Sequence, residues 1–223
     1  MPVLAYIIVA VAAYLLGSIP TGYLVAKAKG IDIRAAGSGN IGATNAMRVL
    51  GKPAGIFVMI VDAAKGYVAV AWLAPHVFIN FASSELWMKP TGLPAINQHL
   101  ANAHILAGIF VVLGHNYTCW LKFKGGKGIA TTAGVYLALA PVALLIALAV
   151  FILSIVITRY VSVGSILAAA VLPVAVWFTR ENLFLESVTI ALCAMAIYKH
   201  KSNIKRLMAG TESRVGKKPE EAK

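Results

Sequence analysis

The sequence Phe123-Lys124-Gly125-Gly126-Lys127-Gly128 lies between apolar segments that are too long for the core of a soluble domain. Its three glycines leave backbone N–H groups able to turn inward around an oxyanion, and its two lysines add positive charge. A helix that begins near Ile129 would point its N-terminus at the same place. We interpret this stretch as a phosphate-binding loop at a membrane surface. The alternative is a solvated cytoplasmic loop whose charge only helps to set membrane topology.

The composition is typical of a polytopic helical membrane protein. Of the 223 residues, 60% are hydrophobic and 13% are charged, and the mean hydropathy is +0.81. The net charge of +12 does not indicate nucleic-acid binding, because the basic residues lie between apolar runs rather than on one face. Cys119 and Cys193 cannot form a disulfide framework, and no Cys/His spacing resembles a metal site. The N-terminus has neither the basic region nor the cleavage site of a signal peptide.

The apolar segments predict an all-α bundle of seven transmembrane helices over residues 1–212, followed by a polar, disordered cytoplasmic tail over 213–223. Five of the expected helices cover residues 4–26, 53–74, 101–120, 161–179 and 182–198. The other two are shorter and lie within residues 129–158. Ala140-Pro141 marks the turn between the two helices of the fourth segment. The glycines and the proline over 17–22 predict a kink or close packing in the first helix. A mixed loop is expected over 75–100.

Charge sets the orientation of the seven helices. One side receives the basic residues of the loops 27–52 and 122–127, Arg159, and the tail from Lys199 onward. The other side receives only Lys89 and Arg180. The N-terminus is therefore expected outside and the C-terminus in the cytoplasm. A count of six spans would place the basic loops and the basic tail on opposite faces, so the charge pattern favours seven.

The first basic loop contains GSGNIGATN over residues 37–45, followed by Arg48. The glycines match the spacing G-x-G-x-x-G, but a dinucleotide site needs a preceding buried strand and a βαβ unit, which the membrane flanks exclude. The hydroxyl, amide and guanidinium groups that remain suit a small phosphorylated polyol, because an arginine can bind two phosphate oxygens at once. The alternative is a flexible turn with a topogenic arginine.

The segment that leads into the glycine-rich stretch contains His115, at the end of a predicted helix. This region is not a nucleotide-binding P-loop, because Gly128 rather than Ser or Thr follows Lys127. His115 is a candidate base or phosphate donor, with a capping or packing histidine as the alternative. Asp62 and Lys65 lie three residues apart within the predicted second helix. An internal ion pair near the site is expected, since ionisable groups are costly at that depth; snorkelling side chains at the cytoplasmic end are the alternative.

Polar residues also flank the last two predicted helices. Ser162 and Ser165 lie at the cytoplasmic start of helix 161–179. If the last helix continues, His200, Asn203 and Arg206 share one face, where they could orient a hydroxyl nucleophile beside a phosphate. The alternative is a basic juxtamembrane helix that contacts anionic lipid.

Three classes of protein fit these features: an interfacial enzyme, a transporter of an organic phosphate and a scaffold for anionic lipid. A transporter usually has paired repeats and helices broken in mid-membrane, whereas these polar motifs gather on one face. A scaffold has no need of two glycine-rich loops beside lysine and arginine. The sequence lacks the H-x-x-x-x-D arrangement of the common glycerolipid acyltransferases. It also lacks a G-x-S-x-G elbow, which argues against a serine hydrolase.

At these motifs the chain resembles the PlsY family, the bacterial membrane acyl-phosphate:glycerol-3-phosphate acyltransferases. The resemblance covers nearly the whole chain, from Leu16 to Glu212. It is carried by residues 37–45, by Gly114-His115 with residues 123–128, and by His200 with Asn203, Arg206 and Glu212. The long outside loop and the longer tail are departures from the family pattern.

The resemblance implies transfer of an acyl group from acyl phosphate to the 1-hydroxyl of glycerol 3-phosphate, without a cofactor, giving lysophosphatidic acid and phosphate. It implies a monomer in the bacterial inner membrane with a cytoplasmic active site. The residues implied for glycerol 3-phosphate are Ser38, Arg48, Lys127, Ser165 and Asn203. Those implied for acyl phosphate are Thr44, Asn45, Lys124, Gly125, Gly126, Lys127 and Gly128. The implied catalytic residues are Lys127, Ser165, His200 and Asn203.

An acyl phosphate is already activated, so such an enzyme can act by positioning and charge neutralisation, without a serine or cysteine nucleophile. Clustered lysines and arginines would offset the repulsion between two anionic substrates. Our hypothesis is that the departing phosphate accepts the hydroxyl proton while His200 or Asn203 orients the hydroxyl.

Overall fold

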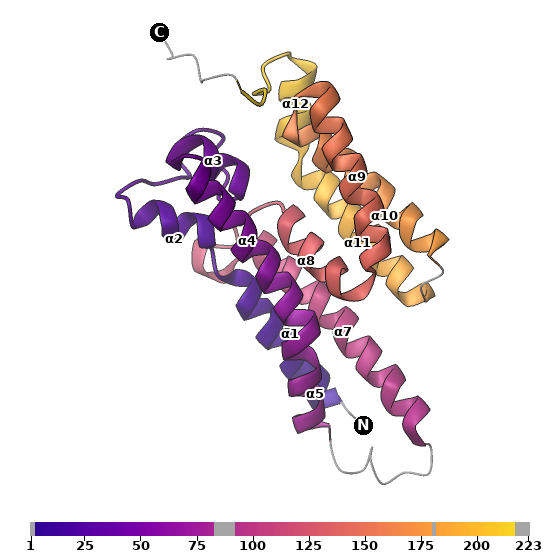
Figure 1. Cartoon of the computed structure of the whole chain (residues 1–223). Helices are drawn as coiled ribbons and strands as arrows, with labels where there is room; N and C mark the ends of the chain where they lie inside the picture. The colour runs from indigo at the N-terminus through magenta and orange to yellow at the C-terminus, as the bar shows by residue number, and fades with distance from the viewer. Residues whose placement is uncertain (1–2, 83–91, 180–181, 217–223) are drawn as a thin grey trace. The chain divides into compact units, whose positions relative to one another are not determined.

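The computed structural model describes residues 3–82, 92–179 and 182–216. All regular structure in these ranges is helical. The chain divides into two compact units, Met1–Leu139 and Ala140–Lys223, each of which is described by itself (Figure 1). The predicted all-α class is confirmed.

The first unit is built on long helical segments that pack side by side. Its elements in chain order are α1 (Val3–Ser18), α2 (Thr21–Lys27), α3 (Ala43–Leu50), α4 (Lys52–Val68), the π-helical turn η1 (Ala69–Leu73), α5 (Ala74–Phe81), α7 (Gly92–Asn116), the 3₁₀ turn η2 (Cys119–Leu121) and α8 (Ile129–Leu139). The α4, η1 and α5 segments form one continuous rod. The chain breaks between α1 and α2, next to Pro20, where the sequence predicted a kink.

Glycines allow the helices of the first unit to approach closely. A Cβ atom on Gly17 would overlap the carbonyl oxygen of Val111, and one on Gly114 would overlap that of Tyr14, so α1 and α7 meet backbone to backbone. Gly134 brings α8 against α4 in the same way. Small residues at helix contacts are the usual means of packing in a membrane, where apolar side chains are equally stable against lipid.

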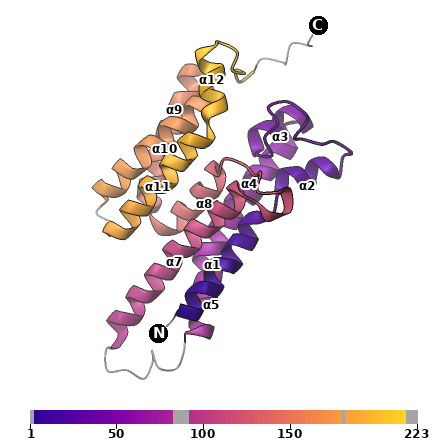
Figure 2. The same ribbon diagram turned by 180° about the vertical axis from the view of Figure 1, so that it is seen from behind.

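The elements that carry the predicted binding residues gather at one end of the first unit. Helices α2 and α3 lie at the end away from the N-terminus and α5 (Figure 1, Figure 2). A buried apolar cluster joins them to α4 and η2; its members are Ala26, Ile33, Ile41, Ala46, Val58 and Leu121. Since Leu121 precedes the glycine-rich segment, the first basic loop and that segment are held at the same end.

The second unit is a bundle of three helices with a short fourth. Its elements are α9 (Pro141–Thr158), α10 (Val161–Phe178), α11 (Leu183–Lys199) and α12 (Lys201–Met208). Pro141 starts α9, as its fixed φ favours, and the side chain of Asn182 caps α11 by accepting from the Leu185 N–H at 2.7 Å. The predicted turn at Ala140-Pro141 is confirmed.

The predicted count of seven spans is not confirmed. Within the described residues, five segments are long and apolar enough to cross a membrane: Val3–Lys27, Lys52–Phe81, Ile96–Leu121, Pro141–Thr158 and Val161–Phe178. A sixth results if α11 and α12, which are bent by 51°, are counted as one span. The remaining apolar helix, α8, has 11 residues, about 16 Å at 1.5 Å per residue, which is roughly half the apolar thickness of a bilayer.

The predicted bounds of one loop were wrong. The mixed loop expected over 75–100 is shorter, because α5 extends to Phe81 and α7 begins at Gly92; residues 83–91 lie outside the described ranges. The last long helix, Leu183–Lys199, agrees with the predicted range 182–198, and a bend of 51° separates it from α12. The described part of the predicted disordered tail is attached to the second unit: the Val215 N–H donates to the Arg159 carbonyl at 2.8 Å, and Arg214 Nε donates to the Tyr160 hydroxyl at 2.9 Å.

Candidate active site

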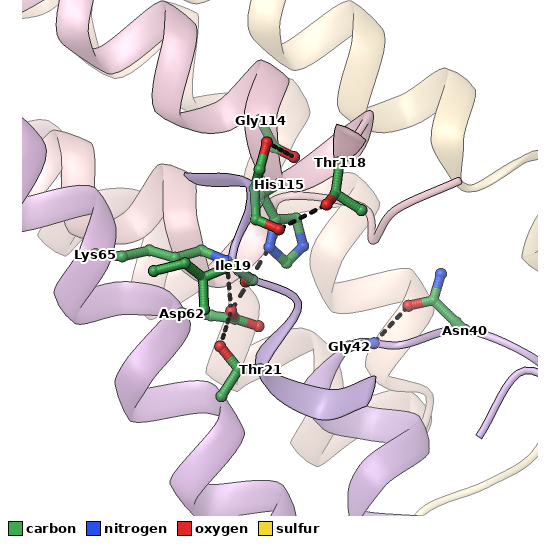
Figure 3. A network of polar contacts seen from close by, with 10 residues as sticks. Ile19, Thr21, Asn40, Gly42, Asp62, Lys65, Gly114, His115 and Thr118 are labelled. Carbon is green, nitrogen blue, oxygen red and sulfur yellow. Dashed lines mark hydrogen bonds and ion pairs between the residues drawn. The ribbon is translucent and has the colours of Figure 1, made fainter. Parts of the chain in front are cut away.

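The loop before α3 is held together by the side chain of Asn45, which is buried. Its Oδ1 accepts from the Ser38 N–H at 2.8 Å, and its Nδ2 donates to the carbonyls of Ala36 at 3.0 Å and Asn40 at 2.8 Å. Asn40 Oδ1 in turn accepts from the Gly42 N–H at 2.8 Å (Figure 3). The loop is therefore ordered by side-chain amides, which argues against a merely flexible turn. The Asn45 amide itself is used inside the loop.

Helix α3 presents two of the predicted binding residues on one face. Thr44 and Arg48 are four residues apart, so their side chains lie one turn above each other. Thr44 is exposed and Arg48 is half-buried, and Ser38 is exposed in the adjoining loop. This end of the first unit therefore offers two hydroxyls and a guanidinium, which can bind phosphate or polyol oxygens.

The glycine-rich segment does not use its backbone as the sequence predicted. The N–H groups of Gly125 and Gly126 donate to the carbonyls of Asn116 at 3.2 Å and His115 at 3.0 Å, and the Lys124 N–H donates to that of Leu121 at 3.1 Å. These donors satisfy carbonyls around the end of α7 instead of turning toward an oxyanion. The N–H groups of Gly125 and Gly126 are therefore not turned inward as expected, and the binding of an anion by this segment stays a prediction.

The glycines of this segment are required by space and conformation. A Cβ atom on Gly125 would overlap the His115 carbonyl, and one on Gly126 would overlap the His115 imidazole. Gly128 has a φ of +83°, which side chains disfavour. The segment also carries two cationic side chains, the exposed Lys124 and the half-buried Lys127, and it leads into the first turn of α8, whose N–H groups have no acceptor within the helix. Helix α8 begins at Ile129, as predicted.

A buried ion pair lies next to the side chain of His115, as the sequence predicted for the neighbourhood of the site (Figure 3). Lys65 Nζ is 2.8 Å from Asp62 Oδ1 and donates to the Ile19 carbonyl at 3.0 Å. The Thr21 hydroxyl donates to the same carboxylate oxygen at 3.2 Å, and His115 Nδ1 lies 3.6 Å from it. Helix α4 is thereby connected to the break between α1 and α2 and to the end of α7.

In the second unit, Glu212 connects two predicted residues of α12. Asn203 Nδ2 donates to Glu212 Oε1 at 2.8 Å, and Arg206 Nε donates to Glu212 Oε2 at 2.7 Å. The prediction that Asn203 and Arg206 share one face of a helix is confirmed. The structural role of Glu212 was not predicted from the sequence, although the family resemblance had included this residue.

His200 and Ser165 are both buried in the second unit, 3% and 5% exposed. His200 lies at the bend between α11 and α12, and its Nδ1 is 2.8 Å from the Ala196 carbonyl oxygen. A carbonyl oxygen can only accept, so Nδ1 carries a proton and donates this hydrogen bond. The Ser165 hydroxyl donates to the Val161 carbonyl at 2.9 Å, within α10.

The pKa of Glu212 lies below its ordinary value. Burial alone would raise the pKa, but the hydrogen bonds donated by Asn203 and Arg206 favour the ionised form and outweigh it. A folded-state pKa below the unfolded-state pKa makes the carboxylate stabilise the fold above the unfolded-state value, and this contribution is lost as the pH falls through the folded-state pKa.

We therefore expect Glu212→Gln to lower the free energy of unfolding at pH 7 by about 1 kcal/mol, since Arg206 is partly solvated and its ion pair is screened. The difference from the unchanged protein should shrink as the pH falls below the ordinary value of 4.5. Denaturant unfolding in detergent micelles at pH 7 and pH 4 measures both quantities. A difference of constant size at the two pH values would contradict this assignment.

The structure thus brings the predicted residues together in two groups. The first unit holds Ser38, Thr44, Asn45, Arg48 and the segment from Lys124 to Gly128 at one end. The second unit holds Ser165, His200 and Asn203. Among the described residues, no group of three or more His, Cys, Asp and Glu side chains could hold a metal ion.

Comparison with known proteins identifies the family. The profile described as "Glycerol-3-phosphate acyltransferase" matches residues 7–210. Relatives with this name include that of Geotalea daltonii, 44% identical over 93% of this chain and 96% of its own. That of Trichlorobacter lovleyi is 46% identical over 91% and 93%, and that of Clostridioides difficile is 45% identical over 99% and 100%.

Two solved structures of PlsY (YgiH), an integral membrane glycerol 3-phosphate acyltransferase, are similar to this chain. The glycerol 3-phosphate form has a TM-score of 0.80 at 34% identity and covers 95% of this chain and 96% of its own. The lysophosphatidic acid form has a TM-score of 0.77 at 34% identity and covers 95% of each chain. The protein is thus an integral, multi-pass membrane acyltransferase. It belongs to the PlsY family of glycerol-3-phosphate acyltransferases.

Proposed function

We propose that the acyl donor is a fatty acyl phosphate, that the acceptor is the 1-hydroxyl of glycerol 3-phosphate, and that the products are lysophosphatidic acid and phosphate. The observation that carries this proposal is the gathering, at one end of the first unit, of an ordered loop with Arg48 and a lysine-bearing segment that ends at a helix N-terminus. Such an end can bind two phosphate-bearing substrates. The forms in which the similar PlsY was solved, with glycerol 3-phosphate and with lysophosphatidic acid, agree with the proposed acceptor and product.

Five side chains are proposed for glycerol 3-phosphate: Ser38, Arg48 and Lys127 of the first unit, and Ser165 and Asn203 of the second unit. Arg48 provides a planar fork for two phosphate oxygens, and Lys127 provides a second positive charge. The hydroxyl and amide groups of Ser38, Ser165 and Asn203 are suited to the polyol hydroxyls and the remaining phosphate oxygen.

The phosphate of the donor is bound by the segment from Lys124 to Gly128, together with Thr44 and Asn45. The charge comes from Lys124 and Lys127, and the first turn of α8 provides N–H donors. Gly125 and Gly126 contribute by letting the segment lie close to α7. Asn45 acts indirectly, because its amide holds the loop that carries Ser38.

In the reaction, the 1-hydroxyl oxygen attacks the acyl carbonyl carbon, the new ester bond forms, and the bond between that carbon and the phosphate oxygen breaks. The departing phosphate accepts the hydroxyl proton. Phosphate is a good leaving group, so the protein acts by positioning the reactants and stabilising developing negative charge. His200 or Asn203 orients the attacking hydroxyl. The acyl chain remains among the helices while its phosphate reaches the lysines.

The protein functions as a monomer in the bacterial inner membrane, without a cofactor, with the N-terminus outside and the active site facing the cytoplasm. The positive-inside rule supports this orientation, because the basic loops around 27–52 and 122–127 lie at the end of the first unit opposite the N-terminus. We assign α8 as a short membrane span, which raises the number of spans from six to seven. With seven spans the N-terminus is outside and the basic C-terminal tail is in the cytoplasm.

The donor is tested with purified protein in detergent. We expect palmitoyl phosphate and glycerol 3-phosphate together to give one phosphate per lysophosphatidic acid, measured by phosphate release and by mass spectrometry. Palmitoyl-coenzyme A and palmitoyl-acyl carrier protein should give no product. Palmitoyl phosphate alone controls for hydrolysis. Equal turnover with either thioester would show that the donor assignment is wrong.

A further inference from the structure

Charged and polar groups from three elements of the first unit meet in the buried network around Asp62 (Figure 3). Helix α4 supplies Asp62 and Lys65, α7 supplies His115, and the break between α1 and α2 supplies Thr21 and the Ile19 carbonyl. Asp62 and Lys65 are 3% and 5% exposed. A buried ion pair adds little stability compared with apolar side chains of the same size, so stability alone does not account for it.

His115 connects this network to the glycine-rich segment. Its Nδ1 faces the Asp62 carboxylate at 3.6 Å, while the Nε2 edge of the ring lies against Gly126, where a Cβ atom would overlap it. The carbonyl of His115 accepts from the Gly126 N–H, and that of Asn116 accepts from the Gly125 N–H. His115 therefore contacts Gly126 through both its side chain and its backbone. The imidazole thus packs directly against the backbone of Gly126, which is covalently joined to Lys127.

We propose that Asp62 is a positioning residue for donor binding: through His115 it fixes the backbone of Gly125 and Gly126, and thereby the position of Lys127 and the start of α8. Lys65 and Thr21 aim the carboxylate, since both contact the oxygen that faces His115. This inference rests on the proposed function for the identity of the donor. Its structural part, the coupling of Asp62 to the glycine-rich segment, does not depend on the donor.

The test variant is Asp62→Asn/Lys65→Met, which removes both charges at nearly constant size and leaves no unpaired buried charge. We expect the KM for palmitoyl phosphate to rise about tenfold or more. The KM for glycerol 3-phosphate should rise less, because this substrate shares only Lys127 with the glycine-rich segment, and the loop of Arg48 is held separately by Asn45. His115→Gln should have the same effect. Combining all three substitutions should add little, because they act through one route.

Hydrogen exchange provides a readout that needs no substrate. We expect the amides of Gly125 and Gly126 to exchange faster in Asp62→Asn/Lys65→Met and in His115→Gln than in the unchanged protein. The matched control is Asp32→Asn, the same substitution in an exposed ion pair with Arg34 in the same unit; it should alter neither the exchange nor the donor KM. Detergent gel filtration and thermal unfolding check that each variant is folded.

Unchanged exchange and an unchanged donor KM in folded Asp62→Asn/Lys65→Met would overturn the proposal, as would a loss confined to kcat or to the KM for glycerol 3-phosphate. If that double variant does not fold, the same criteria apply to His115→Gln. A failure of the proposed function is recognised separately, because the unchanged protein would then release no phosphate from palmitoyl phosphate. The exchange comparison would still decide whether Asp62 holds the segment.

Discussion

Lys127→Met is expected to lower kcat/KM for phosphate release about 1,000-fold. An ammonium about 4 Å from a phosphate charge stabilises it by about 4 kcal/mol at an effective dielectric constant near 20, and each 1.4 kcal/mol is a factor of ten in rate. Lys127 is half-buried, so water only partly replaces its charge. Arg48→Ala should cause a loss of at least about 100-fold, because it removes a bidentate phosphate contact. Both are measured by phosphate release with palmitoyl phosphate and glycerol 3-phosphate.

The matched control for this prediction is Lys122→Met. Lys122 precedes the same glycine-rich segment but is exposed, and its lysine charge is equally removed. We expect its kcat/KM to stay within about threefold of the unchanged protein, since exposed charges are screened by water and salt. Equal effects at the two positions would mean that the segment acts only through its overall charge. An unchanged rate for Lys127→Met would overturn the assignment of the site.

Local signals in the sequence identified the helical class and several breaks between helices. Proline ended or started helices where it was expected, next to Pro20 and at Pro141, because it lacks an N–H and fixes φ. The three-residue spacing also placed Asn203 and Arg206 on one face, and it brought Asp62 and Lys65 into contact. These features depend on neighbours within one helix, so a single sequence contains the information.

Which acceptor each backbone N–H group bonds depends on packing between distant segments. Local sequence signals could not predict it. The glycine-rich segment folds back on α7, where the carbonyls of His115 and Asn116 accept hydrogen bonds from the N–H groups of Gly126 and Gly125. The spacing of the glycines alone is equally compatible with an anion cradle. Asn45 is a similar case: its amide could serve a ligand or the loop, and only the folded loop brings the carbonyls of Ala36 and Asn40 within reach.

The count of spans had a different difficulty. Hydropathy measures how apolar a segment is, and by that measure residues 129–158 are long enough for more than one helix. The turn at Ala140-Pro141 leaves α8 with 11 residues, which is too short to be counted as a span by length. Glycine contacts with α4 account for how such a short helix is held. Whether α8 crosses the membrane therefore depends on the helices that pack against it, and hydropathy does not measure this packing.

His200→Ala is expected to lower kcat by about 10- to 100-fold without abolishing turnover, with both KM values within about threefold. If the departing phosphate accepts the proton, His200 is needed only to orient the hydroxyl. The ring is buried and its Nδ1 proton is held by the Ala196 carbonyl, so the orientation of Nε2 is fixed before substrate arrives. Steady-state kinetics with each substrate varied in turn gives kcat and both KM values.

The matched control for His200→Ala is His76→Ala. The Nδ1 of His76 lies 2.7 Å from the Trp72 carbonyl, the same contact across four residues, but His76 is exposed on α5 in the first unit. We expect His76→Ala to leave kcat unchanged. A lower kcat in His200→Ala alone would then result from the position of His200, and not from the removal of any imidazole that is hydrogen-bonded to its own helix. A general base contributes up to about 10⁴-fold. A loss of that size in His200→Ala, with both substrates still bound, would therefore show that His200, and not the departing phosphate, takes the hydroxyl proton.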